Sequence, residues 1–146
     1  MKTVIALRGI GNTGKSSTLR KVYELLIRRY ALQTHHVNLT VEGALNKSNT
    51  NVIVSINGVK VGIMSLGDVP GILARNLREC EFKGCAIIVC ASRTAGSFET
   101  LVNDLKRSSY EIEWVDKRKE GDTKTERDAA NLRVAEEILT KIEELL

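Results

Sequence analysis

A short segment near the N-terminus, GIGNTGKS at residues 9–16, has the side chains and the glycine spacing needed to hold phosphate. It fits the pattern G-x-x-x-x-G-K-[ST] at every defined position. Its glycines let the backbone wrap closely around an anion, so that successive N–H groups point inward. Lys15 supplies a positive charge for the outer phosphates, and the Ser16 hydroxyl is placed to bind Mg²⁺. Without a ligand, the Lys15 ammonium group is expected at the surface with its charge unpaired.

The elements expected on either side of this segment suit that chemistry. An apolar strand is predicted over residues 4–7 and an amphipathic helix over 15–30, so the positive end of the helix dipole lies beneath the glycines. This strand, loop and helix resemble the P-loop NTPase superfamily, in its kinase/GTPase-like branch. The resemblance implies that the residues binding the nucleotide include Gly9, Gly11, Asn12, Thr13, Gly14, Lys15, Ser16 and Ser17.

The rest of the chain reads as alternating strands and helices. Asn57-Gly58 between two apolar runs predicts a β-hairpin with a type I′ turn. Residues 43–51 read as a loop, whereas 36–42 fit either a strand or a mobile loop. Further predicted elements are a helix at 70–79, a strand at 86–90, a helix around 98–105, a strand at 112–115, and a last helix opened by the capping-box pair Thr123 and Glu126.

This order predicts an α/β three-layer sandwich with the P-loop NTPase fold. Its central sheet would be mostly parallel with one antiparallel hairpin, and helices would cover both faces. Ligands of such sheets bind outside the carboxyl ends of the strands. We therefore expect four further loops to face the glycine-rich segment, at 40–50, 67–71, 91–96 and 116–122.

Asp68 begins the sequence Asp68-x-x-Gly71 directly after an apolar strand. This is similar to the D-x-x-G of P-loop GTPases, which implies that Asp68 holds Mg²⁺ with Ser16 and that Gly71 senses the terminal phosphate. Asp68 also suits the N-cap of a helix that starts near Pro70, and the two roles are compatible. Arg93 follows a buried strand, where it is either a catalytic arginine reaching the γ-phosphate or a solvated loop residue.

The base-reading motif of GTPases, [NT]-K-x-D, should follow the strand at 112–115, where this chain has Asp116-Lys117-Arg118-Lys119. Lys117 is in register and could brace a base. Lys119 replaces the carboxylate that accepts the guanine N–H groups, and an ammonium group cannot accept a hydrogen bond. ATP is therefore expected over GTP. Ile72 follows Gly71 in place of the glutamine that orients water in many GTPases, so fast unaided hydrolysis is not expected.

Composition places few further limits on function. The length of 146 residues predicts a single domain over 1–146, and the net charge of +4 suits nucleotides without indicating nucleic acid. No signal peptide or membrane-spanning run is visible, so a cytoplasmic protein is expected. Cys80, Cys85 and Cys90 match no compact metal motif, and Cys85 and Cys90 are expected to be small buried residues.

The sequence thus predicts a nucleoside-triphosphate-binding protein that uses Mg²⁺ and is an ATPase or a phosphotransferase, with Lys15, Asp68 and Arg93 as its catalytic residues. Three alternatives remain open. They are a GTPase-like switch, a small-molecule kinase, and a nucleotide-binding interaction module with negligible turnover and an unknown protein partner.

Overall fold

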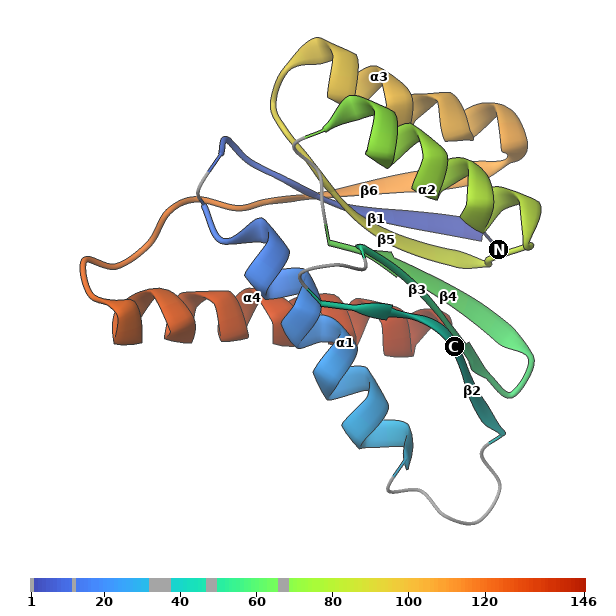
Figure 1. Cartoon of the computed structure of the whole chain (residues 1–146), viewed down its shortest axis with the longest axis horizontal. Helices are drawn as coiled ribbons and strands as arrows, with labels where there is room; N and C mark the ends of the chain where they lie inside the picture. Colours follow the sequence, from blue (N-terminus) through green and yellow to red (C-terminus); the bar gives the residue numbers. More distant parts are fainter. Residues whose placement is uncertain (1, 12, 32–37, 47–49, 66–68) are drawn as a thin grey trace.

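A computed structural model of the chain describes residues 2–11, 13–31, 38–46, 50–65 and 69–146. These residues form a six-stranded sheet between two layers of helices (Figure 1). Helices α1 and α4 lie on one face of the sheet, and α2 and α3 lie on the other. The strands are β1 (Lys2–Arg8), β2 (Leu39–Leu45), β3 (Thr50–Ile56), β4 (Val59–Met64), β5 (Ile87–Ser92) and β6 (Tyr110–Asp116). The helices are α1 (Lys15–Ala31), α2 (Pro70–Phe82), α3 (Gly96–Asn103), the 3-10 helix η1 (Asp104–Ser108) and α4 (Lys124–Leu145).

The strands are arranged in the order β2-β3-β4-β5-β1-β6. Strand β3 is antiparallel to both of its neighbours, and the remaining pairs β4–β5, β5–β1 and β1–β6 are parallel. The mixed α/β sheet with helices on both faces confirms the predicted class. Because the carboxyl ends of β1, β5 and β6 meet at one edge of the sheet, the segments that follow them are brought together.

Strand β2 corrects the loop predicted over residues 43–51. Residues 39–45 pair along their whole length with β3, so this region adds a second antiparallel pair to the predicted hairpin. Leu39 and Leu45 pack into the core beside α1, which gives the strand its apolar anchors. The open question over 36–42 is thereby answered as a strand for 39–42, and positions 36 and 37 lie outside the described residues.

The predicted turn between β3 and β4 is confirmed. Asn57 has a φ of 51° and Gly58 has a φ of 84°, which are the two positive angles that a type I′ turn requires. Strand β1 belongs to the core of both layers, since its residues from Val4 to Leu7 are fully buried and contribute side chains on both faces of the sheet. A strand buried on both faces can be almost entirely apolar, as it is here.

Helix α4 begins where the capping pair predicts. The Thr123 hydroxyl accepts the N–H of Glu126 at 3.1 Å, and the Glu126 carboxylate accepts the N–H of Asp122 at 2.8 Å. Both bonds satisfy donors that would otherwise lack a partner at the start of a helix. They also fix the end of the segment 117–123, which runs from β6 to α4 beside the glycine-rich loop (Figure 1). No helix within the described residues has the length and apolarity to cross a membrane.

Candidate functional site

The glycine-rich loop, residues 9–16, joins β1 to α1 and is held by the ends of both neighbouring strands. The Gly9 N–H donates to the carbonyl of Ser92 at the end of β5, at 3.0 Å. On the other side, the N–H of Lys117 donates to the carbonyl of Arg8 at 2.7 Å. A Cβ on Gly9 would lie only 2.4 Å from the carbonyl oxygen of Lys117. The close approach of the segment after β6 therefore requires glycine at position 9.

Gly14, the last glycine of the loop, is required for a different reason. Its φ is +86°, in the region that side chains disfavour, and a Cβ there would meet the side chain of Asn131 at 2.5 Å. Asn131 comes from α4, so the final helix packs directly against the loop. The turn into α1 is completed by the Thr18 hydroxyl, which donates to the Gly14 carbonyl at 2.7 Å.

Lys15 corrects one expectation from the sequence. We expected an unpaired ammonium group at the surface, but the residue is only 5% exposed. Its Nζ donates to the carbonyl oxygens of Gly9 at 2.9 Å and Ile10 at 2.7 Å. The loop curls around this side chain and turns those carbonyls toward it, which compensates part of the cost of burying a charge. The ammonium group thus lies against the carbonyls of the first two residues of the loop.

The hydroxyl groups of the loop have well-defined partners. Ser16 Oγ donates to the carbonyl of Ser65, just beyond β4, at 2.6 Å. Thr13 Oγ1 donates to the carbonyl of Ile10 at 3.0 Å. Ser17 is exposed, and its hydroxyl accepts a hydrogen bond from Arg20 at 3.3 Å. Ser16 therefore links the start of α1 to the end of β4.

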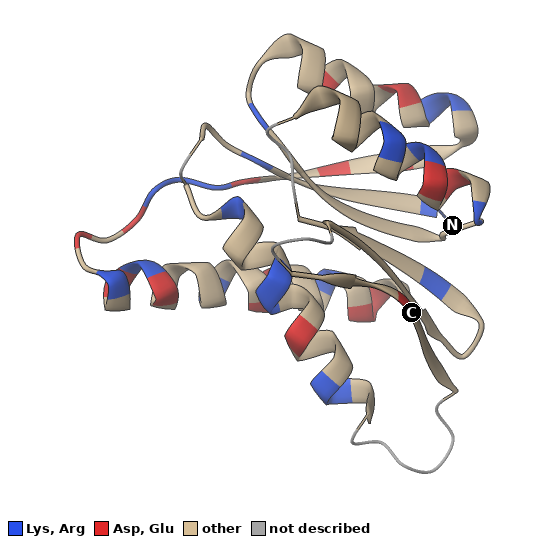
Figure 2. Ribbon diagram, viewed as in Figure 1, with Lys and Arg blue, Asp and Glu red and all other residues tan. Residues whose placement is uncertain are grey.

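A cavity of about 370 Å³ opens between the loop, the segment after β6 and the first turns of α4. Four of its lining side chains are basic and two are acidic, so positive charge predominates. Apart from Lys15 at the start of α1, these charges lie on the segment between β6 and α4 and at the start of α4, at the left of Figure 2. The lining residues are Thr13, Gly14, Lys15, Ser16, Ser17, Lys117, Lys119, Glu120, Arg127, Asp128 and Asn131.

Lys117 lines this cavity, and its ammonium group is held locally. The residue is 4% exposed, and Nζ donates to the carbonyl of Arg118 at 2.7 Å. Burial lowers the pKa of Lys117, because the charged form loses hydration. Glu120 also lines the cavity and forms an ion pair with Arg133 of α4, which lowers the pKa of the Glu120 carboxyl. The two side chains give the cavity one buried cation and one carboxylate.

The end of β6 is held by an ion pair at the base of the same segment. Arg8 Nε donates to Asp116 Oδ1 at 2.9 Å, and the guanidinium lies over the ring of Trp114 at 4.6 Å. The hydrogen bond from Arg8 lowers the pKa of the Asp116 carboxyl. Asp116 therefore faces Arg8 and away from the cavity lining, and it anchors the segment that carries Lys117 and Lys119.

Arg93 lies beside the loop on the side of β5. A Cβ on Gly11 would lie 3.0 Å from its guanidinium, so the arginine covers the outer part of the loop. It is exposed and does not line the cavity described above. The structure thus brings together at the glycine-rich loop three elements that are remote in sequence, namely the end of β5, the segment after β6 and α4.

Two predicted site residues, Asn12 and Asp68, lie outside the described residues. Gly71 is exposed in the first turn of α2. The N-cap position of α2 is Val69, which makes no side-chain cap, so the alternative that gave this position to Asp68 is wrong. Strand β4 does not neighbour β1, since β5 lies between them.

Sequence reasoning missed the contribution of α4. Arg127, Asp128 and Asn131 line the cavity from one face of this helix. Their spacing is helical, and they stand in its first two turns, before the buried positions become frequent. The polar first turns of α4 were a possible sign of a binding site. The sequence does not state, however, which loop this helix packs against.

Comparisons of the chain with protein-family models, with curated proteins and with solved structures found no match. Within the described part of the chain, no three His, Cys, Asp or Glu side chains gather into a group that could hold a metal ion.

Proposed function

We propose that this chain is a P-loop protein that binds a nucleoside triphosphate, ATP with Mg²⁺, and hydrolyses it or transfers its γ-phosphate. The observation that carries the proposal is the cavity itself, which has the glycine-rich loop on one wall and basic side chains on the other. A triphosphate is a compact polyanion, and a loop of backbone N–H groups at the start of a helix is suited to hold one.

Lys15 supports this assignment through its present partners. Its ammonium group is bound by carbonyl oxygens of the loop at 2.7 and 2.9 Å, so it is already folded back onto the loop. A phosphate bound there would offer charged oxygens in place of neutral carbonyls, and hydrogen bonds between charged groups are the stronger ones. The lysine is thus prepared to exchange partners without a large movement.

The Mg²⁺ part of the proposal depends on Ser16 and Asp68. Ser16 donates to the carbonyl of Ser65, and Asp68 follows three positions later in the sequence. One hydroxyl and one carboxylate are a suitable donor set, because Mg²⁺ retains several waters and takes its remaining ligands from phosphates. The metal would neutralise charge on the outer phosphates.

The base would lie against the segment 117–120 and α4. We propose adenine, since Lys119 replaces the carboxylate of the guanine motif, and Asn131 offers the paired donor and acceptor that adenine can use. One observation favours the alternative of GTP. Glu120 lines the cavity, and its carboxylate could accept the guanine N–H groups if it released Arg133.

Arg93 is proposed to act on the terminal phosphate from the other side of the loop. Its guanidinium covers Gly11, where it could stabilise negative charge that develops during phosphoryl transfer. This role distinguishes an enzyme from a binding module. Loss of turnover with retained binding in Arg93→Ala would support an enzyme, and unchanged turnover would remove Arg93 from the mechanism.

Calorimetric titration of MgATP and MgGTP into the protein tests the binding proposal. We expect tighter binding of MgATP, and a loss of roughly 10- to 150-fold in Lys15→Ala, since a hydrogen bond to a charged group contributes about 1.5–3 kcal/mol. Lys106→Ala, which alters an exposed lysine on η1, is the matched control. Because Lys15 is buried, circular dichroism must first establish that the variant is folded. Equal affinity of the two variants for MgATP would refute the assignment, and tighter binding of MgGTP would favour the GTPase alternative.

A further inference from the structure

The C-terminal end of α2 brings two cysteines together through its backbone. Gly84 has a φ of +78°, and its N–H donates to the carbonyl of Glu81 at 3.1 Å. The N–H of Cys85 donates to the carbonyl of Cys80 at 3.0 Å. These two bonds define a Schellman motif, in which the two residues joined by the outer bond normally make an apolar contact. Here both of those residues are cysteines.

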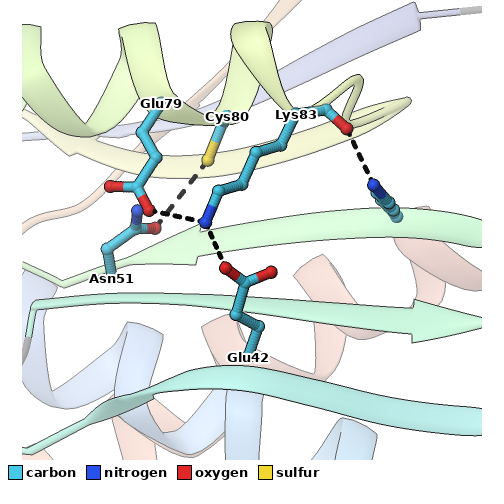
Figure 3. Close-up of polar contacts among 6 residues, drawn as sticks. Glu42, Asn51, Glu79, Cys80 and Lys83 are labelled. Carbon is cyan, nitrogen blue, oxygen red and sulfur yellow. Dashed lines mark hydrogen bonds and ion pairs between the residues drawn. The ribbon is translucent and has the colours of Figure 1, made fainter.

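The two sulfur atoms occupy the same small space above β4. A Cβ on Gly62 would lie 2.4 Å from Sγ of Cys80 and 3.4 Å from Sγ of Cys85, so the absence of a side chain at Gly62 makes room for both. The Cys80 thiol donates to Oδ1 of Asn51 at 3.8 Å (Figure 3). Both thiols are buried and unoxidised.

Two lysines and two glutamates lie near one side of the pair. Lys83, just before Gly84, binds Glu79 at 3.1 Å and also Glu42 of β2 (Figure 3). Its carbonyl accepts a hydrogen bond from Lys60 of β4 at 3.0 Å. The hydrogen bond from Cys80, together with these two lysines, lowers the pKa of the Cys85 thiol.

The pKa of the partner thiol, Cys80, is shifted in the opposite direction. Its hydrogen bond to Cys85 and its burial raise the pKa of Cys80. Thiolates are the nucleophiles of disulfide exchange, so Cys85 is the sulfur that reacts first and Cys80 is the one that resolves. Cys90, buried within β5, is a useful reference, because burial alone raises its pKa to about 12.

We infer that Cys80 and Cys85 form a reversible disulfide that fastens the end of α2 to the start of β5. The oxidant is a low-molecular-weight disulfide. The Cys85 thiolate attacks one sulfur of this disulfide, which forms a mixed disulfide and releases one thiolate. Cys80 then loses its proton to solvent and attacks Sγ of Cys85, and the second thiolate leaves. Two protein thiols are oxidised to one disulfide, and the reagent is reduced to two thiols.

Access to the buried pair comes from the position of the motif at a helix end. Helix ends open at lower free energy than the core, and both cysteines belong to one six-residue stretch that contains the exposed Phe82 and Gly84. Opening of this last turn presents both sulfurs together. The inference does not depend on nucleotide binding.

The test is to refold the urea-unfolded, reduced protein in buffers of increasing ratio of oxidised to reduced glutathione. The remaining free thiols are then alkylated, and the mass of the protein is measured by mass spectrometry. We expect one disulfide per chain in oxidising buffer, with native circular dichroism and a melting temperature about 4–8 °C above that of the reduced protein. Trypsin should yield residues 79–83 joined to residues 84–93. The linkage should persist in Cys90→Ala and vanish in Cys80→Ala.

Three results would overturn the inference. One is alkylation of all three cysteines at every glutathione ratio. Another is a linkage that disappears in Cys90→Ala. The third is loss of the native spectrum when the disulfide forms, since the bond is inferred for the folded chain.

Discussion

Replacement of Gly9 by alanine tests how tightly the segment after β6 is packed on the glycine-rich loop. The added Cβ would lie 2.4 Å from the carbonyl oxygen of Lys117. Ordinary carbon–oxygen contacts are about 3.3–3.6 Å long, so the two backbones must separate by roughly 1 Å. Lys117 cannot retreat freely, because its N–H is bound to Arg8 at 2.7 Å. We expect a loss of about 1–3 kcal/mol in the free energy of unfolding.

The assay is urea unfolding followed by the fluorescence of Trp114, the only tryptophan of the chain. Gly96→Ala is the matched control, since a Cβ on Gly96 meets nothing within 4 Å and its φ is not positive. That variant should be unchanged or more stable by up to about 1 kcal/mol, because alanine favours a helix more than glycine does. Equal stability of Gly9→Ala and Gly96→Ala would refute the packing argument.

Three further outcomes are expected. Gly14→Ala should be roughly 1 kcal/mol less stable than Gly58→Ala. Both residues have similar positive φ values, but only a Cβ on Gly14 meets a side chain. Equal losses of stability in urea unfolding would contradict this. Asp116→Asn should lower the melting temperature at pH 7 but not near pH 2. Arg8 lowers the pKa of Asp116, so the stabilisation from the ion pair is lost as the pH falls through that lowered pKa. A difference in melting temperature that persists at pH 2 would exclude the ion pair as its cause. Asp68→Asn should weaken ATP binding in Mg²⁺ more than in EDTA, and equal weakening in titration calorimetry would remove Asp68 from the metal site.

Local signals in the sequence predicted much of the framework. The apolar run at 4–7, the Asn57-Gly58 turn and the Thr123 cap depend on interactions within a few residues, and the structure has each of them. Residues 39–42 of β2 were predicted as either a strand or a mobile loop, and the prediction of a loop for 43–45 was wrong. Most of this strand is exposed, and Gly43 interrupts its alternation of apolar and polar residues. Its pairing with β3 is a long-range property.

The interior of the candidate site depended on contacts that the sequence does not state. The burial of Lys15 arises from carbonyl groups whose direction is set by the folded loop. The approach of Asn131 requires α4 to pack beside α1, and the position of β5 between β4 and β1 is a matter of topology. Cys80 and Cys85 likewise meet only because Gly84 turns the chain.

The central claim, that a nucleoside triphosphate binds between the glycine-rich loop and the segment 117–120, is tested most directly by amide hydrogen exchange with and without MgATP. Bound phosphates would take up the N–H groups of residues 13–17, and a base would cover residues 117–120. We expect slower exchange in these two segments and little change in α3. Saturating MgATP that leaves exchange in both segments unaltered, or that protects α3 in their place, would contradict the claim.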